Sequence, residues 1–139
     1  MGVEAFNYCD YLKSVSLNEG LEKLGEKEIV NREKVEGEVF SDTAIKRIRL
    51  PSTLKRVEAR MFESCQNLKR VEIPSGVEYI GTECFMDSGI KKITLPDTLK
   101  KIGKDAFDDC PSLRTVWVEE GCTLNIRKYV GDGVKVRRK

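Results

Sequence analysis

The most informative absence from this sequence is histidine. The chain of 139 residues contains none. Histidine is the side chain that most often acts as a general base or binds a transition metal near neutral pH, so its absence excludes a Ser-His-Asp triad, a Cys-His dyad and every zinc site that uses histidine. Only chemistry based on carboxylates, lysine, tyrosine or cysteine alone stays open. We therefore expect a protein that is not an enzyme and that uses no cofactor.

Long apolar segments are also missing. The sequence has no run of about 18 apolar residues, which is the length a membrane-spanning helix needs. Its first residues, MGVEAFNYCDYLK, lack the cationic start and the apolar stretch of a secretory signal. If the chain is complete as given, these absences predict a cytoplasmic location.

Paired cysteine motifs are missing as well. The five cysteines are an odd number, and no two have the CxxC spacing of zinc ribbons or redox centres. Three of them, Cys9, Cys65 and Cys110, each stand three residues after a phenylalanine. This recurrence indicates a small buried apolar side chain that fills the same structural position in successive units.

Composition and length describe one ordinary folded domain. The 25 basic and 23 acidic residues give a net charge of +2, and 40% of the residues are hydrophobic. These values are typical of a globular chain, and the length corresponds to about one domain. We therefore treat residues 1–139 as a single domain.

What the sequence does contain is a repeat of 22 or 23 residues. The phenylalanines Phe40, Phe62, Phe85 and Phe107 are separated by 22, 23 and 22 positions. The apolar positions and the proline before each of the last three phenylalanines coincide as well. The aligned segments are IKRIRLPSTLKRVEARMF (45–62), LKRVEIPSGVEYIGTECF (68–85) and IKKITLPDTLKKIGKDAF (90–107). A fixed period of this length is typical of proteins built from stacked coils.

Each repeat begins with a predicted strand. Its LKxVxL segment alternates apolar and polar residues, which is typical of a half-buried strand, and the proline that follows cannot donate to a ladder and ends it. No unit can bury its apolar side alone, so the units must stack with their strands parallel. We expect these strands at 12–17, 45–50, 68–73, 90–95 and 113–118.

Two segments depart from the repeats, which occupy residues 5–121. An insertion of about eleven residues within roughly 26–37 is mostly charged or β-branched. It predicts a solvated loop or a short surface helix, with a functional protrusion as the alternative. Residues 122–139 have the pattern strand, Gly-Asp-Gly turn, strand, which predicts a C-terminal cap hairpin.

The pattern LxxVxIPxxVxxIGxxAFxxCxxL covers the chain from Ala5 to about Gly121 and is clearest in LKRVEIPSGVEYIGTECFMDSGI and LPDTLKKIGKDAFDDCPSL. It closely resembles the repeat of the BspA-like (Treponema-type) leucine-rich repeat family. This resemblance implies a right-handed superhelix with a parallel concave β-sheet. We therefore predict an α/β repeat solenoid of about five units. The resemblance also implies a cell-surface or extracellular location and a role in adhesion or ligand binding.

The first unit shows no polar cap. The repeats begin at Ala5, almost inside a unit, whereas repeat arrays normally need a polar outer face at each end. We therefore expect the chain to be a fragment of a larger adhesion-type protein. An uncovered apolar end either frays or pairs with a second copy, so a dimer through the N-terminal end is a further expectation.

Charge is segregated onto the exposed positions of the predicted strands. In each of the five predicted strands we count three positions: the two before the central apolar residue and the one after it. Of these fifteen positions, nine are basic and one is acidic. This strip sums to +8, and because the whole chain is +2, all other positions together carry −6. Solvation is one interpretation, since long cationic side chains splay toward water. The other is attraction of an acidic protein or an anionic glycan, with nucleic acid the least expected partner.

The candidate ligand-binding residues lie on this strip. Trp117, the only tryptophan, is either a contact anchor or part of the cap under the C-terminal hairpin. The alternative to surface adhesion is an intracellular scaffold for protein–protein interaction that uses the same face, which free cysteines would favour. We expect no catalytic or metal-binding residue. The candidates are Arg47, Arg49, Arg70, Glu72, Lys92, Thr94, Thr115 and Trp117.

Overall fold

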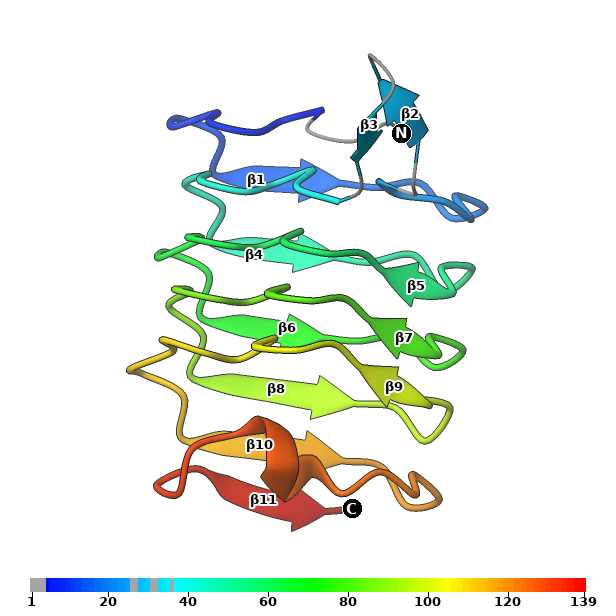
Figure 1. The fold of residues 1–139 in the computed structure, drawn as a ribbon, viewed down its shortest axis with the longest axis vertical. Coiled ribbons are helices and arrows are strands. Elements are labelled where there is room, and N and C mark those ends of the chain that lie inside the picture. The colour runs from blue at the N-terminus through cyan, green and yellow to red at the C-terminus, as the bar shows by residue number, and fades with distance from the viewer. Residues whose placement is uncertain (1–4, 26–27, 31–32, 36) are drawn as a thin grey trace.

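Six parallel strands stack along one side of the molecule (Figure 1). The computed structural model describes residues 5–25, 28–30, 33–35 and 37–139. Strand β1 pairs with β4, and β6, β8, β10 and β11 form one continuous ladder. The chain is therefore a parallel β-solenoid, and each of the five predicted strands contains an observed one. The six strands are β1 (Ser14–Ser16), β4 (Arg47–Arg49), β6 (Arg70–Glu72), β8 (Lys92–Leu95), β10 (Thr115–Val118) and β11 (Lys135–Arg138).

A second, smaller sheet forms where each coil turns back. It consists of β5 (Arg56–Val57), β7 (Tyr79–Ile80) and β9 (Lys101–Ile102), paired in parallel in that order. No strand was predicted here; Val57, Ile80 and Ile102, one from each short strand, are buried. Each coil from β4 to β9 thus has a longer strand on one side and a two-residue strand on the other.

Helix is nearly absent from the described residues, which corrects the α/β part of the prediction. Their only helical element is a 3-10 helix, Ile126–Tyr129. The turns around the phenylalanines fail to become helices because residues on both sides adopt left-handed backbone angles, as at Glu83 (φ 55°) and Asp87 (φ 54°) beside Phe85. Such angles cannot continue a right-handed helix. The right-handed superhelix and the concave curvature of the sheet stay predictions.

The C-terminal segment differs from the predicted hairpin. Strand β11 pairs in parallel with β10, with Val136 opposite Val116, so it adds one more strand to the ladder instead of folding back on its own neighbour. The reason lies in Val134 and Val136, which are partly buried against the core and continue its inward-facing positions. The 3-10 helix lies in the connection from β10 to β11.

The insertion also differs from the prediction. Strands β2 (Glu28–Val30) and β3 (Glu33–Val35) form an antiparallel pair where a loop or a short surface helix was expected. The β-branched residues at the ends of these strands favour extended backbone over helix. At the base of the insertion the Gly37 amide donates to the Gly25 carbonyl across 2.7 Å, which closes the segment.

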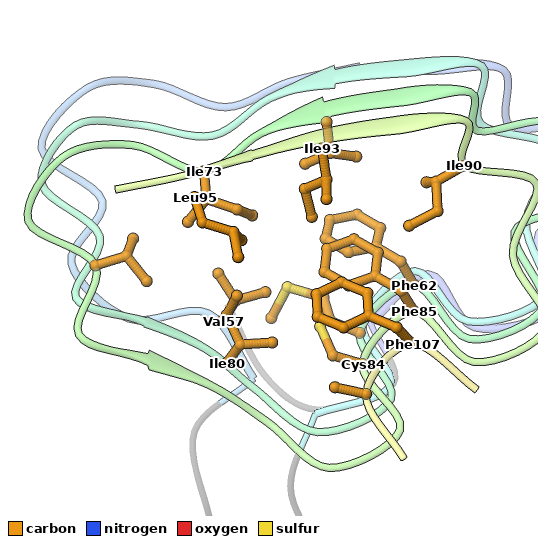
Figure 2. Packing of buried hydrophobic residues seen from close by; sticks show 14 of the residues in the cluster. Val57, Phe62, Ile73, Ile80, Cys84, Phe85, Ile90, Ile93, Leu95 and Phe107 are labelled. Carbon is orange, nitrogen blue, oxygen red and sulfur yellow. The ribbon is translucent and has the colours of Figure 1, made fainter. Parts of the chain in front are cut away.

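A column of phenylalanine rings runs through the core (Figure 2). Neighbouring ring centroids are 5.4 to 5.8 Å apart, and the rings are tilted by only 2° to 13°. This offset parallel stacking is a favourable arrangement for aromatic rings. It explains the strict spacing of phenylalanine in the sequence, because each coil must place its ring above the last. The column consists of Phe6, Phe40, Phe62, Phe85 and Phe107.

The recurring cysteine position is polar, which corrects the prediction of an apolar filler. The Cys65 thiol donates to the Phe40 carbonyl across 3.0 Å, and the Cys110 thiol donates to the Phe85 carbonyl across the same distance. In the alternate coils Thr43 and Ser88 hold this position and contact the cysteines at 3.5 and 3.6 Å. The position therefore requires a small donor that satisfies a buried carbonyl.

The main sheet is interrupted between β4 and β6. At the start of most coils an amide donates to the preceding strand, as Lys46 does to the Lys13 carbonyl (2.9 Å) and Lys91 does to the Lys69 carbonyl (2.8 Å). The corresponding Lys69 amide donates to no backbone carbonyl within the described ranges. Strands β4 and β6 nonetheless lie side by side (Figure 1). The coils that contain β1 and β4 thus contact the rest of the main sheet, but no strand pairing joins β4 to β6.

This interruption predicts a local difference in amide hydrogen exchange. We expect the Lys69 amide to exchange about tenfold or more faster than the Lys91 amide, because an amide without an acceptor needs no opening of the sheet to exchange. Heteronuclear NMR after transfer into deuterium oxide measures both rates in one sample. Equal protection of the two amides would contradict the interruption.

Candidate ligand-binding surface

Each strand of the main sheet presents two side chains on its outer side. The residues between them point inward: Val71, Ile93 and Val116 are buried, and their counterparts in β1, β4 and β11 are partly buried. This alternation follows from the pleat of a β-strand. We call the outer side the strand face, and it consists of Ser14, Ser16, Arg47, Arg49, Arg70, Glu72, Lys92, Thr94, Thr115, Trp117, Lys135 and Arg137.

The strand register sorts these side chains into two columns. In β6, β8, β10 and β11 the first column contains Arg70, Lys92, Thr115 and Lys135, and the second contains Glu72, Thr94, Trp117 and Arg137. Six of the eight predicted site residues are therefore neighbours on one continuous ladder. The other two, Arg47 and Arg49, lie on β4 beyond the interruption, where they pair with Ser14 and Ser16.

Among the described residues, the cations predicted on the strand face form no hydrogen bond or ion pair, although the pKa of the Glu19 carboxyl is lowered by the hydrogen bonds from Ser52 and, after them, by the charge of Arg49. No hydrogen bond or ion pair joins Arg47, Arg49, Arg70 or Lys92 to any described residue, and the same is true of Glu72. All five side chains are exposed. Their charges are therefore available to a ligand.

Several cations elsewhere on the solenoid are paired with carboxylates. The Arg60 guanidinium bridges Glu38 and Glu83 at 2.8 and 2.7 Å, and both carboxylates raise its pKa. Lys100 pairs with Glu78 at 2.8 Å and holds the pKa of that carboxyl below its usual value. Ion pairs between neighbouring coils are thus possible in this fold. Among the described residues, none forms on the strand face.

The strip of fifteen predicted positions is not uniform. The Lys69 ammonium donates to the Gln66 carbonyl at 2.8 Å, and the Arg114 guanidinium donates to the Pro111 carbonyl at 2.9 Å. These two cations, which come just before their strands, satisfy carbonyls of the preceding turn. Their role is structural, whereas Arg47, Arg49, Arg70 and Lys92 make no such bond among the described residues.

A hollow of about 290 Å³ lies over β6, β8 and β10. It forms because Thr94 is a small residue between two larger ones in the second column, Glu72 and Trp117. The buried Val71 and Ile93 lie beneath it. Its lining consists of Arg70, Val71, Glu72, Lys92, Ile93, Thr94, Trp117 and Lys139.

Trp117 has features of both roles predicted for it, a contact anchor for a ligand and a residue covered by the C-terminal segment. The Arg137 guanidinium and the Lys139 ammonium each lie 5.7 Å from its ring centroid, so the C-terminal segment contacts the ring. The ring is nevertheless partly exposed and lines the hollow. Sequence reasoning missed Lys135, Arg137 and Lys139 because it treated the last residues as a separate cap. The alternation of Val134 and Val136 with charged residues was the signal for another strand.

Other kinds of site find little support in the described residues. Within those ranges no group of three or more acidic or cysteine side chains is arranged to hold a metal ion. No described helix is long and apolar enough to cross a bilayer. All five cysteines are free, and burial raises the pKa of the Cys65, Cys84 and Cys110 thiols. These three thiols therefore stay protonated near neutral pH.

Comparison with known proteins agrees with this architecture. A parallel solenoid with a period of 22 or 23 residues and a strand at the start of each repeat is typical of leucine-rich repeats. The family profile described as BspA type Leucine rich repeat region matches six copies, over residues 1–36 and 33–131. The chain belongs to the BspA-type leucine-rich repeat family.

One solved structure similar to this chain is the crystal structure of the pneumococcal vaccine antigen PcpA. The TM-score is 0.68 at 19% sequence identity, and the match covers 99% of this chain and 38% of that one. At this identity the likeness shows the fold alone. No curated protein sequence matches the chain.

Proposed function

We propose that the chain is a non-catalytic recognition module that binds an acidic protein or an anionic glycan through the strand face. The observation that carries this proposal is the set of unpaired cations Arg47, Arg49, Arg70 and Lys92. In this proposal the strand face is the concave side of a right-handed superhelix, the side on which curved solenoids commonly bind ligands. Thr115 and Trp117 extend the surface toward the C-terminal end.

Electrostatics supports this use of the strand face. Arg70 and Lys92 are directly opposite each other on neighbouring strands, and like charges in that position are slightly destabilising. A bound anion would remove this repulsion. Lys135 and Arg137 add positive charge at the C-terminal end, so the face attracts an acidic partner and raises its association rate.

The first candidate for the setting of this binding is cell-surface adhesion, and its support is membership of the BspA-type leucine-rich repeat family. The second candidate is an intracellular scaffold for protein–protein interaction that uses the same face. Its specific support is the presence of five free cysteines, which are more common in reducing compartments than in secreted proteins. Both candidates make the same prediction about the strand face.

Charge reversal on the strand face tests the proposal. We expect a variant with Arg47→Glu, Arg49→Glu, Arg70→Glu and Lys92→Glu to lose affinity for heparin and for polyglutamate by about 100-fold or more, because four attractive charges become repulsive. Surface plasmon resonance at two salt concentrations measures both affinities. Circular dichroism checks that the variant remains folded.

A matched control has the same net charge but leaves the strand face intact. It replaces Lys55, Lys101, Lys104 and Lys128 with glutamate, and all four side chains are exposed on other surfaces. We expect its affinities to stay within about threefold of the original protein, since screening weakens charges at this distance. The proposal fails if the strand-face variant binds as well as this control.

A further inference from the structure

The hollow over Thr94 brings three kinds of chemistry into one small space. One wall is the indole ring of Trp117, and another is formed by the cations Arg70 and Lys92. Glu72, Thr94 and a third cation, Lys139, also line it, together with Val71 and Ile93. A volume of about 290 Å³ lies at the lower end of small-molecule sites, which suits one ring-sized group. A helix or a folded loop is too large for it.

The charges in the hollow select a ligand that is more than a simple anion. Arg70 and Lys92 attract a negative group, and neither is bonded to another described side chain. Glu72 stands in the next column of the same strand and repels the same group. A ligand that satisfies all three residues must present an anion on one side and hydrogen-bond donors, such as hydroxyl groups, on the other.

The indole ring adds a demand for an apolar surface. The face of an aromatic ring carries partial negative charge and attracts the slightly positive C–H groups of a saturated ring. The cations Arg137 and Lys139 near the Trp117 ring help to hold it in place. A sugar ring offers such a C–H face, whereas the charged side chains of an acidic peptide do not.

We infer that the hollow over Thr94 is a subsite for one carboxylated sugar residue of an anionic glycan. The carboxylate contacts Arg70 and Lys92, the hydroxyls donate to Glu72 and Thr94, and the apolar face of the ring packs on Trp117. The subsite rests on the proposed function and narrows its ligand to glycans that contain uronate units. The rest of the glycan continues along the strand face.

Titration with tetragalacturonate, an oligosaccharide of four carboxylated sugars, tests the subsite. Trp117 is the only tryptophan, so its fluorescence reports contact in the hollow directly. We expect saturable binding of tetragalacturonate with a change in this fluorescence. We expect no saturable binding of its methyl ester, which has the same rings without the negative charges.

Filling the hollow supplies the decisive variant. Thr94→Phe occupies the space without changing the charge, and Ser16→Phe is the matched control, because Ser16 lies in the corresponding column on β1, outside the hollow. We expect Thr94→Phe to weaken tetragalacturonate binding about tenfold or more and Ser16→Phe to change it less than about twofold. A second variant, Trp117→Leu, should weaken binding to a similar extent when measured by calorimetry.

Polyglutamate binding, measured in parallel, separates this inference from the proposed function. Thr94→Phe and Ser16→Phe both lie on the strand face and keep all its cations, so we expect the two variants to bind polyglutamate with affinities within about twofold of each other. If polyglutamate binds but Thr94→Phe and Trp117→Leu leave tetragalacturonate binding unchanged, the subsite is wrong and the proposed function stands. If Thr94→Phe weakens only polyglutamate binding, the hollow accepts an acidic peptide and the inference is overturned. Absence of binding to every anion overturns both.

Discussion

Replacing Phe85 with alanine is expected to lower the free energy of unfolding by about 3–5 kcal/mol. The ring is fully buried and stacks on Phe62 at 5.4 Å and on Phe107 at 5.7 Å, so its removal leaves a cavity with two exposed ring faces. The coils cannot collapse into this cavity easily. The Phe62 amide donates to the Cys84 carbonyl and the Phe85 amide donates to the Ala106 carbonyl, at 2.9 and 2.8 Å, which fixes the coil spacing.

Urea denaturation followed by circular dichroism measures this effect. The matched comparison is Phe6→Ala, because Phe6 is only partly buried and stacks on a single described ring, Phe40. We expect the Phe6 variant to lose less than half as much stability as the Phe85 variant. A loss below about 1 kcal/mol for Phe85→Ala would contradict the ring column, since such a small value is typical of a surface position.

The second large effect is expected for Gly81→Ala, which adds a single carbon atom. A Cβ atom at this position would lie 2.3 Å from the Ala59 nitrogen and 2.6 Å from the Glu58 carbonyl carbon. Both are backbone atoms, and the Gly81 amide already donates to the Val57 carbonyl at 2.8 Å, so the two coils cannot separate without losing hydrogen bonds. We expect a loss of about 3 kcal/mol, at the upper end of the range for overpacking.

The control for this substitution is Gly131→Ala. No atom lies within 4 Å of a Cβ added at Gly131, so the same chemical change meets open space there. We expect its stability to stay within about 0.5 kcal/mol of the original protein. Thermal melts of both variants show the contrast directly, and equal melting temperatures would show that the coils are not packed at this distance.

Gly81 also explains why glycine recurs in the repeat. Gly103 holds the same position one coil later and would place a Cβ 2.3 Å from the Thr82 nitrogen. One coil earlier the position is occupied by Glu58, whose buried carboxylate pairs with the Arg56 guanidinium at 2.6 Å. The glycine is therefore set by contact between neighbouring coils, which the sequence alone does not show.

Much of the fold follows from periodicity that the sequence displays openly. The phenylalanine spacing and the LKxVxL alternation locate the coils and the main strands, because both patterns come from side chains that must point inward. The two-residue strands such as Arg56–Val57 are too short to show any period. A strand after the Gly-Asp-Gly turn was predicted, and β11 is that strand, but its parallel pairing with β10 was not predicted because the sequence gives no partner or register for a short, mostly charged strand.

The candidate site was predictable in part for the same reason. Alternation places Arg70, Lys92 and Trp117 on the outer side of their strands, and the structure has them there. The hollow was not predictable, because it depends on which residues face each other across strands. The small side chain of Thr94 matters only when Glu72 and Trp117 are known to flank it. The lack of partners for the cations is likewise visible only in three dimensions.

The missing ladder between β4 and β6 has a mechanical consequence. These two coils are joined elsewhere, through the pairing of β5 with β7, the contact of Phe62 with Phe85 and backbone bonds such as that from the Arg60 amide to the Thr82 carbonyl. Among the described residues, the backbone bonds between the two coils therefore lie outside β4 and β6. Arg49 and Glu72 line one hollow at the unbonded strands, so a polymer that contacts both residues would link the two coils where the backbone does not.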